Sequence, residues 1–297
     1  MSLQTQCGAP SPGLVPAPVL PTLWELLTTK SGNKRRIFSM DSHKARLSAD
    51  AGKPVVIHYM ASADGGTKLY PELGLSFNVC PMATSCAEDC LDKSGRMGSP
   101  NVTDSYRHKA VAYHLYPSQY MEVIHDNLKW LAVSIPARLN GTSDLRIEKI
   151  ILPSTGLNIL ESNPGRDFYD YTKWRLKYRE GYLASGGHLT YSFNEGKNAI
   201  RNAREYLAAG MSVAVVIAGP LGCKAPKKTA IATLARLIEA GTLWGRPVID
   251  GDKYDDRRGD APGSLVLLTA KGPALHNSKG FVLRFDESLN LVAGSQI

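Results

Sequence analysis

Three of the chain's five cysteines lie in one short segment, CPMATSCAEDC, and thiols gathered in this way are typical of metal sites. Five residues separate Cys80 from Cys86, and three separate Cys86 from Cys90. Structural zinc sites commonly leave two residues between paired cysteines, so this spacing differs from theirs. Three thiolates on one loop, with no obvious fourth, are what an iron–sulfur cluster with one open iron requires. We therefore expect these cysteines to hold a [4Fe–4S] cluster.

Two other interpretations of the cysteines remain open at this stage. Unpaired cysteines are often buried as small apolar side chains, but the polar residues between these three indicate a loop rather than a core strand. A zinc ion could be bound if a histidine such as His108 or His114 supplied a fourth ligand. Zn²⁺ is therefore the alternative to the iron–sulfur cluster.

Carboxylates and a lysine stand at the ends of predicted strands and are candidates for catalysis. Asp250 and Asp252 flank a glycine in VIDGD, where paired carboxylates could hold Mg²⁺ or act as base and nucleophile. An ordinary Asp-Gly turn is the alternative there. In DFYDYTK, Asp170 alternates with aromatic residues, and Lys173 could reach a phosphate or a carboxylate at the strand end. With Asp144, which ends the segment ARLNGTSD, these are the candidate catalytic residues.

These side chains need a scaffold, and the hydrophobic pattern predicts strands that alternate with helices. We expect strands within 54–62, 73–79, 137–144, 167–173, 188–195, 212–219, 246–252, 264–272 and 281–286, and helices within 103–135 (divided at Pro117), 197–210 and 227–241. This alternation predicts an α/β fold, either a partial (βα)6-type barrel or an open parallel sheet, with an N-terminal extension. In both architectures the active site lies at the carboxyl ends of the strands, where the polar residues recur.

The composition divides the chain into three parts. Residues 1–22 are rich in Pro, Ala and Gly and are expected to form a disordered or loosely docked arm. Residues 23–53 are expected to form a helical extension, and residues 54–297 a single barrel-like domain, since no long linker interrupts them.

Charge and cysteine usage indicate the compartment and the kind of partner. No run of eighteen apolar residues and no secretory signal is visible, so we expect no membrane span and a cytoplasmic protein with reduced thiols. The formal charge of +8 favours a nucleic acid or nucleotide partner, with an ordinary basic protein as the alternative. The pattern does not indicate an oligomeric state. Phosphate-loop, nucleophile-elbow and zinc-deaminase motifs are absent.

The cysteine segment and the residues before it, KLYPELGLSFNV, resemble a motif of small phage-encoded three-cysteine proteins of mostly unassigned function. RLNGTSD, FYDYTK and VIDGD resemble blocks that follow the cysteines in those proteins, so the resemblance covers most of the chain. It implies a barrel-like α/β region and, for a phage-encoded protein, the host cytoplasm.

More distantly, the layout resembles the radical SAM superfamily, in which a three-cysteine loop follows the first strand of a partial (βα)6 barrel. This resemblance implies that Cys80, Cys86 and Cys90 are the cluster ligands and that S-adenosylmethionine binds the open iron. It places Gly141, Thr142 and Ser143 near the methionine amino group, and Ser192 and Asn194 near the ribose or carboxylate. The spacing here, CxxxxxCxxxC, differs from the CxxxCxxC usual in that superfamily.

The sequence thus leads to one principal hypothesis and two alternatives. The first is an iron–sulfur, radical-SAM-like enzyme that modifies nucleic acid or a nucleotide. The second resembles the zinc-containing tRNA-guanine transglycosylase barrel, which implies attack on a ribose by an aspartate such as Asp144 or Asp250. The third is a non-catalytic nucleic-acid-binding protein stabilised by zinc.

Overall fold

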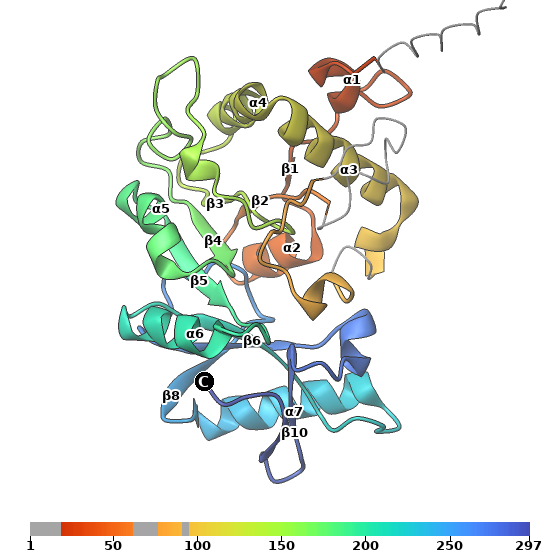
Figure 1. Cartoon of the computed structure of the whole chain (residues 1–297), viewed down its shortest axis with the longest axis vertical. Coiled ribbons are helices and arrows are strands. Elements are labelled where there is room, and N and C mark those ends of the chain that lie inside the picture. The colour runs from red at the N-terminus through yellow and green to blue at the C-terminus, as the bar shows by residue number, and fades with distance from the viewer. Residues whose placement is uncertain (1–18, 62–76, 91–94) are drawn as a thin grey trace, which may run out of the picture.

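The computed structural model describes residues 19–61, 77–90 and 95–297, and within them the chain is a mixed α/β protein built on mostly parallel strands (Figure 1). The helices are α1 (Leu23–Leu27), α2 (His43–Asp50), α3 (Pro100–Leu115), α4 (Pro117–Lys129), α5 (Glu180–Ala184), α6 (Ala199–Ala208) and α7 (Pro226–Ala240). The strands are β1 (Phe38–Ser39), β2 (Val56–His58), β3 (Ala137–Arg138), β4 (Tyr169–Thr172), β5 (His188–Ser192), β6 (Val213–Ala218), β7 (Thr242–Leu243), β8 (Arg246–Asp250), β9 (Leu265–Thr269), β10 (Val282–Phe285) and β11 (Leu291–Ala293). Short 3-10 turns are η2 (Ser85–Ala87), η4 (Gly95–Gly98), η5 (Ile147–Lys149), η6 (Leu176–Tyr178) and η7 (Gly272–His276). The α/β fold class expected from the sequence is confirmed.

Among the described residues eight strands run parallel: seven follow the spatial order β2, β3, β4, β5, β6, β9, β8, and the eighth, β10, pairs with β6. A single bridge between Ala137 and Phe168 joins the small sheet of β1, β2 and β3 to β4. Strand β6 is central, because it pairs with β9 along one edge and with both β5 and β10 along the other. Its sequence, VAVVIA, is wholly apolar, as is usual for parallel strands covered on both faces.

The parallel strands curl around helix α2 without closing. In a flat sheet β2 and β9 would lie about 24 Å apart, given about 4.8 Å between neighbouring strands. Here Ile57 of β2, Tyr169 of β4, Ala214 of β6 and Val266 of β9 belong to one buried cluster with Ala45 of α2. Among the strands that the structure describes, β8 does not pair with β1 or β2, so the architecture is a partial barrel.

Proline and glycine mark several helix boundaries, although α3 begins at Pro100, before the expected residue 103, and α4 ends at Lys129, before the expected residue 135. Pro117 occupies the first turn of α4 and separates it from α3, since proline is tolerated only at a helix start. Helix α7 likewise begins at Pro226 and ends before Gly241, whose φ of 72° is left-handed. Figure 1 shows α6 and α7 on the lower part of the molecule, where α6 packs on β5 and β6 and α7 packs on β6, β8 and β9.

The N-terminal segments extend the same core. Helix α1 packs on α3 and buries Leu26 and Leu27 in the main apolar cluster, while β1 pairs antiparallel with β2. Residues 1–18 of the expected arm lie outside the described residues. Of the strand expected at 73–79, residues 77–79 are not extended into a strand and the rest lie outside the described residues.

None of the helices in the described ranges is both long enough and apolar enough to cross a membrane.

Candidate functional site at the carboxyl ends of the strands

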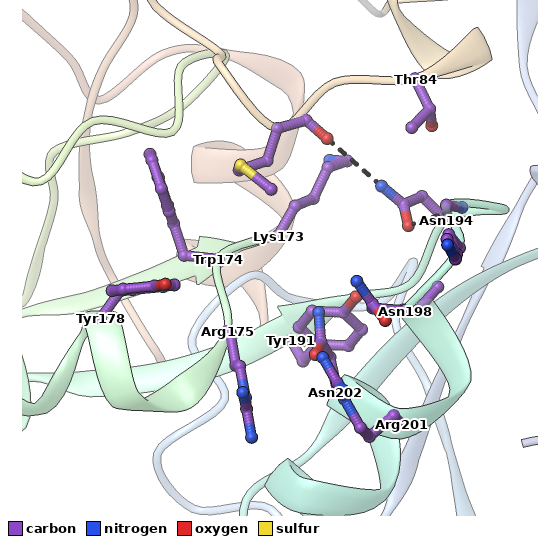
Figure 2. A pocket seen from close by; sticks show the side chains of 14 residues that line it. Thr84, Lys173, Trp174, Arg175, Tyr178, Tyr191, Asn194, Asn198, Arg201 and Asn202 are labelled. Carbon is purple, nitrogen blue, oxygen red and sulfur yellow. Dashed lines mark hydrogen bonds between the residues drawn. The ribbon is translucent and has the colours of Figure 1, made fainter.

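The cysteine loop lies over the carboxyl ends of β3, β4 and β5. The Glu195 carboxylate, just after β5, accepts hydrogen bonds from the Thr84 hydroxyl at 2.9 Å and from the Ser85 amide at 2.7 Å. Beside it, the Asn194 amide donates to the Met82 carbonyl at 3.3 Å (Figure 2). These bonds fix the first half of the loop on β5.

The second half of the loop is fastened by residues near the end of the chain. The Asn277 side chain, which follows η7, donates to the Asp89 carboxylate at 2.5 Å. The Lys279 ammonium contacts both carboxylate oxygens of Glu88, at 2.7 and 2.8 Å. One hydrogen bond from an amide and one ion pair therefore attach this half of the loop to the segment before β10.

The three thiols share one neighbour, Lys173, at the end of β4. Cys80, Cys86 and Cys90 are half-buried, and their charges act on the Lys173 ammonium, which donates to the Ser192 hydroxyl at 3.2 Å. Burial alone would lower the pKa of Lys173, but the negative charges that the thiols carry when ionised, together with that of Asp144, outweigh it and the pKa is raised. Burial raises the pKa of Cys80 to about 12 against the opposing charge of Lys173. Lys173 alone therefore does not make Cys80 a thiolate at neutral pH.

Asp144 joins the turn after β3 to the end of β4. Its carboxylate accepts hydrogen bonds from the Thr172 hydroxyl and the Lys173 amide, both at 2.7 Å, and from the Arg179 guanidinium at 3.5 Å. Its carbonyl accepts a bond from the indole nitrogen of Trp174 at 2.9 Å. Burial raises the pKa of Asp144, and the charge of Arg179 opposes this effect. Asp144 therefore shapes the floor of the site and is itself buried.

The three cysteines near Lys173 could supply thiolates, which are the ligands that soft metals and iron–sulfur clusters prefer. Their placement, however, does not form a ligand set in this structure. Within residues 19–61, 77–90 and 95–297, no three His, Cys, Asp or Glu side chains are arranged to hold a metal ion. A metal would have to draw the loop more tightly together, and residues 91–94, directly after Cys90, lie outside the described part.

The turn Gly141–Thr142–Ser143 bonds mainly to its own surroundings. Any side chain at Gly141 would lie 2.7 Å from the His58 carbonyl, so the close approach to β2 requires glycine. The Thr142 hydroxyl donates to the Met60 carbonyl, and the Ser143 hydroxyl donates to the Asn140 side chain at 2.8 Å. These contacts explain the residue types by the path of the backbone.

Asp170 has the alternation expected of β4, and its contacts are with neighbouring elements of the scaffold. Its carboxylate accepts from the Asn140 amide at 2.9 Å and from the Asn140 side chain at 3.1 Å, and Tyr182 of α5 donates to it at 3.4 Å. Burial raises the pKa of Asp170 to about 6, although the charge of Arg138 opposes the rise. Asp170 thus ties β4 to the turn after β3.

Asp250 and Asp252 belong to a different group, at the ends of β8 and β9. The Asp250 carboxylate accepts from the Asp252 amide at 2.9 Å, which is the local turn considered for this Asp-Gly pair. Asp252 accepts from the Thr269 hydroxyl at 2.6 Å and the Lys271 ammonium at 2.8 Å. Lys44 of α2 lies 3.9 Å from Asp252, and burial lowers the pKa of Lys44 to about 8. This group therefore couples α2 to the sheet.

Of the residues singled out in the sequence, the structure brings together one set at the ends of β4 and β5. This set is Cys80, Cys86, Cys90, Asp144, Lys173, Ser192 and Asn194.

A cavity of about 270 Å³ opens beside this set, and sequence reasoning did not find it (Figure 2). Its walls carry basic, aromatic and amide side chains and no acidic ones. They are Met82, Thr84, Lys173, Trp174, Arg175, Tyr178, Tyr191, Asn194, Gly196, Lys197, Asn198, Ala199, Arg201 and Asn202. A signal was present in GKNAIRN, where Lys197 and Arg201, and Asn198 and Asn202, are four residues apart and so share one side of α6.

Comparison with known proteins gave one match, to a protein family. The model of the family described as "Gene product 88" matches residues 27–284, which include the cysteine loop, the strands from β1 to β9 and nearly all of β10. Searches of curated proteins and of solved structures found no match.

Proposed function

We propose that this chain, which belongs to the gene product 88 family of phage-type proteins, is an enzyme that binds an iron–sulfur cluster through Cys80, Cys86 and Cys90. The proposed reaction site is the carboxyl end of the parallel strands, and the proposed substrate is a nucleic acid or a nucleotide. The observation that carries the proposal is the convergence of three half-buried thiols on Lys173, at the edge of the sheet where α/β proteins carry their sites.

The chain's own residues supply two functions in this proposal. Lys173 places a positive charge beside the thiols, which lowers the cost of gathering several thiolates in one place. Asn194 and Glu195 hold the loop against β5, which keeps the half-buried thiols near Lys173. When bound, an iron–sulfur cluster would supply one-electron chemistry at this position.

S-adenosylmethionine is the ligand that the radical SAM resemblance suggests for an open iron, and it remains a secondary part of the proposal. Two features of the fold do not add support to it. Strand β9 lies between β6 and β8, whereas a barrel of successive βα units places strands in chain order. In the turn Gly141–Ser143, the two side-chain hydroxyl groups already donate hydrogen bonds to Met60 and Asn140.

The test is metal analysis of the full chain purified without oxygen, with its visible absorption spectrum. We expect iron and sulfide in the wild type, and loss of both in Cys80→Ala, Cys86→Ala and Cys90→Ala. The matched control is Cys223→Ala, because Cys223 lies outside the loop and should not change the iron content. Iron-free protein after reconstitution with iron and sulfide would contradict the proposal, and stoichiometric zinc would favour the zinc-containing alternatives.

A further inference from the structure

We propose that the cavity between the end of β4 and the start of α6 binds a nucleotide, with its phosphate at the N-terminus of α6 and its base against Trp174 and Tyr178. This inference deepens the proposed function, on which it rests for the claim that chemistry follows binding. The binding itself needs only side chains of the chain, so it can be measured without any metal.

One end of the cavity is suited to an anion. Helix α6 is ten residues long, its first turn carries no side-chain cap, and Gly196–Ala199, which lead into it, line the cavity. Within this segment the Gly196 amide is bonded to the Asn194 side chain and the Ala199 amide to the Gly196 carbonyl, so the amides after Ala199 face the phosphate. Unsatisfied amide groups at a helix N-terminus attract phosphate. Lys197 and Arg201 flank this turn and add two positive charges. Glu205 contacts Arg175 closely, at 2.7 Å, and lies 4.0 Å from Arg201. The phosphate is therefore assigned to the first turn of α6.

The other end of the cavity is aromatic. Trp174 and Tyr178 lie on the opposite side of the cavity from Asn194 and Asn198 (Figure 2). Tyr178 is 47% exposed. Lys177 lies over one face of its ring and Arg146 over one face of Trp174, so each ring has its other face for a ligand. A planar base can stack on such rings, and base–aromatic stacking tolerates every base. Together with the phosphate position, this favours a ligand that carries both an anionic group and an aromatic ring.

A buried amide oxygen in the wall is the independent sign of a ligand. Asn202 is only 7% exposed and lines the cavity; its side chain bonds to Tyr191, yet its side-chain oxygen has no hydrogen-bond partner. A buried acceptor without a partner costs about 1–3 kcal/mol, so native proteins rarely keep one without a reason. A nucleotide supplies the missing donor through a ribose hydroxyl or an exocyclic amino group.

The size of the cavity restricts the ligand. About 270 Å³ is at the lower end of small-molecule sites, so one nucleotide unit fits the cavity better than a dinucleotide cofactor. That unit is either a free nucleoside monophosphate or the terminal nucleotide of a single strand.

The test is calorimetric titration of the full chain with adenosine 5′-monophosphate, adenosine, inorganic phosphate and a 5′-phosphorylated oligodeoxythymidylate. We expect binding of the monophosphate or the oligonucleotide, weakened by salt, and at least about tenfold weaker binding of adenosine. If the monophosphate binds more tightly, the natural ligand is a free nucleotide. If the oligonucleotide binds more tightly, the natural ligand is the terminal nucleotide of a single strand. No binding of either probe, or equal binding of adenosine and its monophosphate, would overturn the inference.

Variants on α6 separate a site from general charge attraction. Arg201→Gln is expected to weaken binding about tenfold, whereas Arg204→Gln, the same charge change at a residue of α6 that does not line the cavity, should leave it within about twofold. Asn202→Leu should abolish binding without unfolding the chain, as circular dichroism would show. Equal effects of the two arginine variants would refute the site.

Metal content is measured on the same samples. Protein that binds the monophosphate but takes up no iron on reconstitution would count against the proposed iron–sulfur enzyme alone. Absence of binding in iron-loaded protein would count against the nucleotide site alone.

Discussion

Asp144→Ala is expected to lower the free energy of unfolding by about 2–4 kcal/mol, because the carboxylate satisfies three donors at once. The Thr172 hydroxyl and the Lys173 amide each lose a 2.7 Å hydrogen bond, worth about 1 kcal/mol apiece. Arg179 is fully buried, and losing Asp144 at 3.5 Å adds a further share, but Glu148 at 3.4 Å and the Thr172 hydroxyl at 3.2 Å still contact the guanidinium. The raised pKa of Asp144 shows that burial already costs the ionised group something, which holds the total within this range.

Urea unfolding followed by circular dichroism measures this change, and two further variants sharpen it. Asp144→Asn keeps the size and one acceptor, so we expect a smaller loss of about 1–3 kcal/mol. Asp41→Ala breaks an arginine–aspartate pair of 2.9 Å whose two side chains are each 69% exposed, and should cost less than about 1 kcal/mol. If Asp144→Ala costs no more than Asp41→Ala, then burial is not what makes the Asp144 contacts important, and the reasoning fails.

Two more predictions concern the scaffold. The folded-state pKa of Asp170, about 6, is above its ordinary 3.8, so its contribution is complete below about pH 4 and is lost as pH rises through 6, a change of about 3 kcal/mol. Asp170→Asn should remove this dependence, so urea unfolding should favour the variant more at pH 7 than at pH 4.5; the same difference at both pH values would contradict the shift. Gly141→Ala should destabilise the fold by about 1–3 kcal/mol or more, because its Cβ would lie 2.5 Å from Tyr59. Gly181→Ala, whose Cβ would meet nothing closer than 3.8 Å, should be neutral or slightly stabilising, and equal melting temperatures of the two variants would refute the explanation.

The elements of the fold were predictable where local pattern decides them. Strand β6 is wholly apolar, Pro117 separates two helices, and Gly210 follows α6 with a φ of 77°, as its position after the helical pattern led us to expect. Residues 137–144 form a strand only at Ala137–Arg138. The reason is that the Asn140 side chain accepts a hydrogen bond from the Leu145 amide, and this bond turns the chain. The alternation of apolar and polar residues does not reveal such a contact.

The arrangement of the strands and of the cavity was not predictable from one sequence. The place of β9 between β6 and β8 depends on pairing between segments distant in the chain, on which local pattern carries no information. The cavity has the same origin, since Trp174 and Tyr178 follow β4 while Asn198 and Asn202 belong to α6. Asp252 was a catalytic candidate because the sequence does not reveal its contact with Lys44. The two residues are neighbours in space, but Lys44 precedes Asp252 by 208 residues.

The attachment of the cysteine loop to Asn277 and Lys279 also has a consequence for the timing of biosynthesis. These contacts join residues 188 and 191 positions apart, so the ribosome makes the loop long before it makes the residues that fasten it. At about 5–20 residues per second, the interval is roughly 10–40 s. A metal delivered during synthesis would meet an open loop, and a metal delivered afterwards would meet a fastened one.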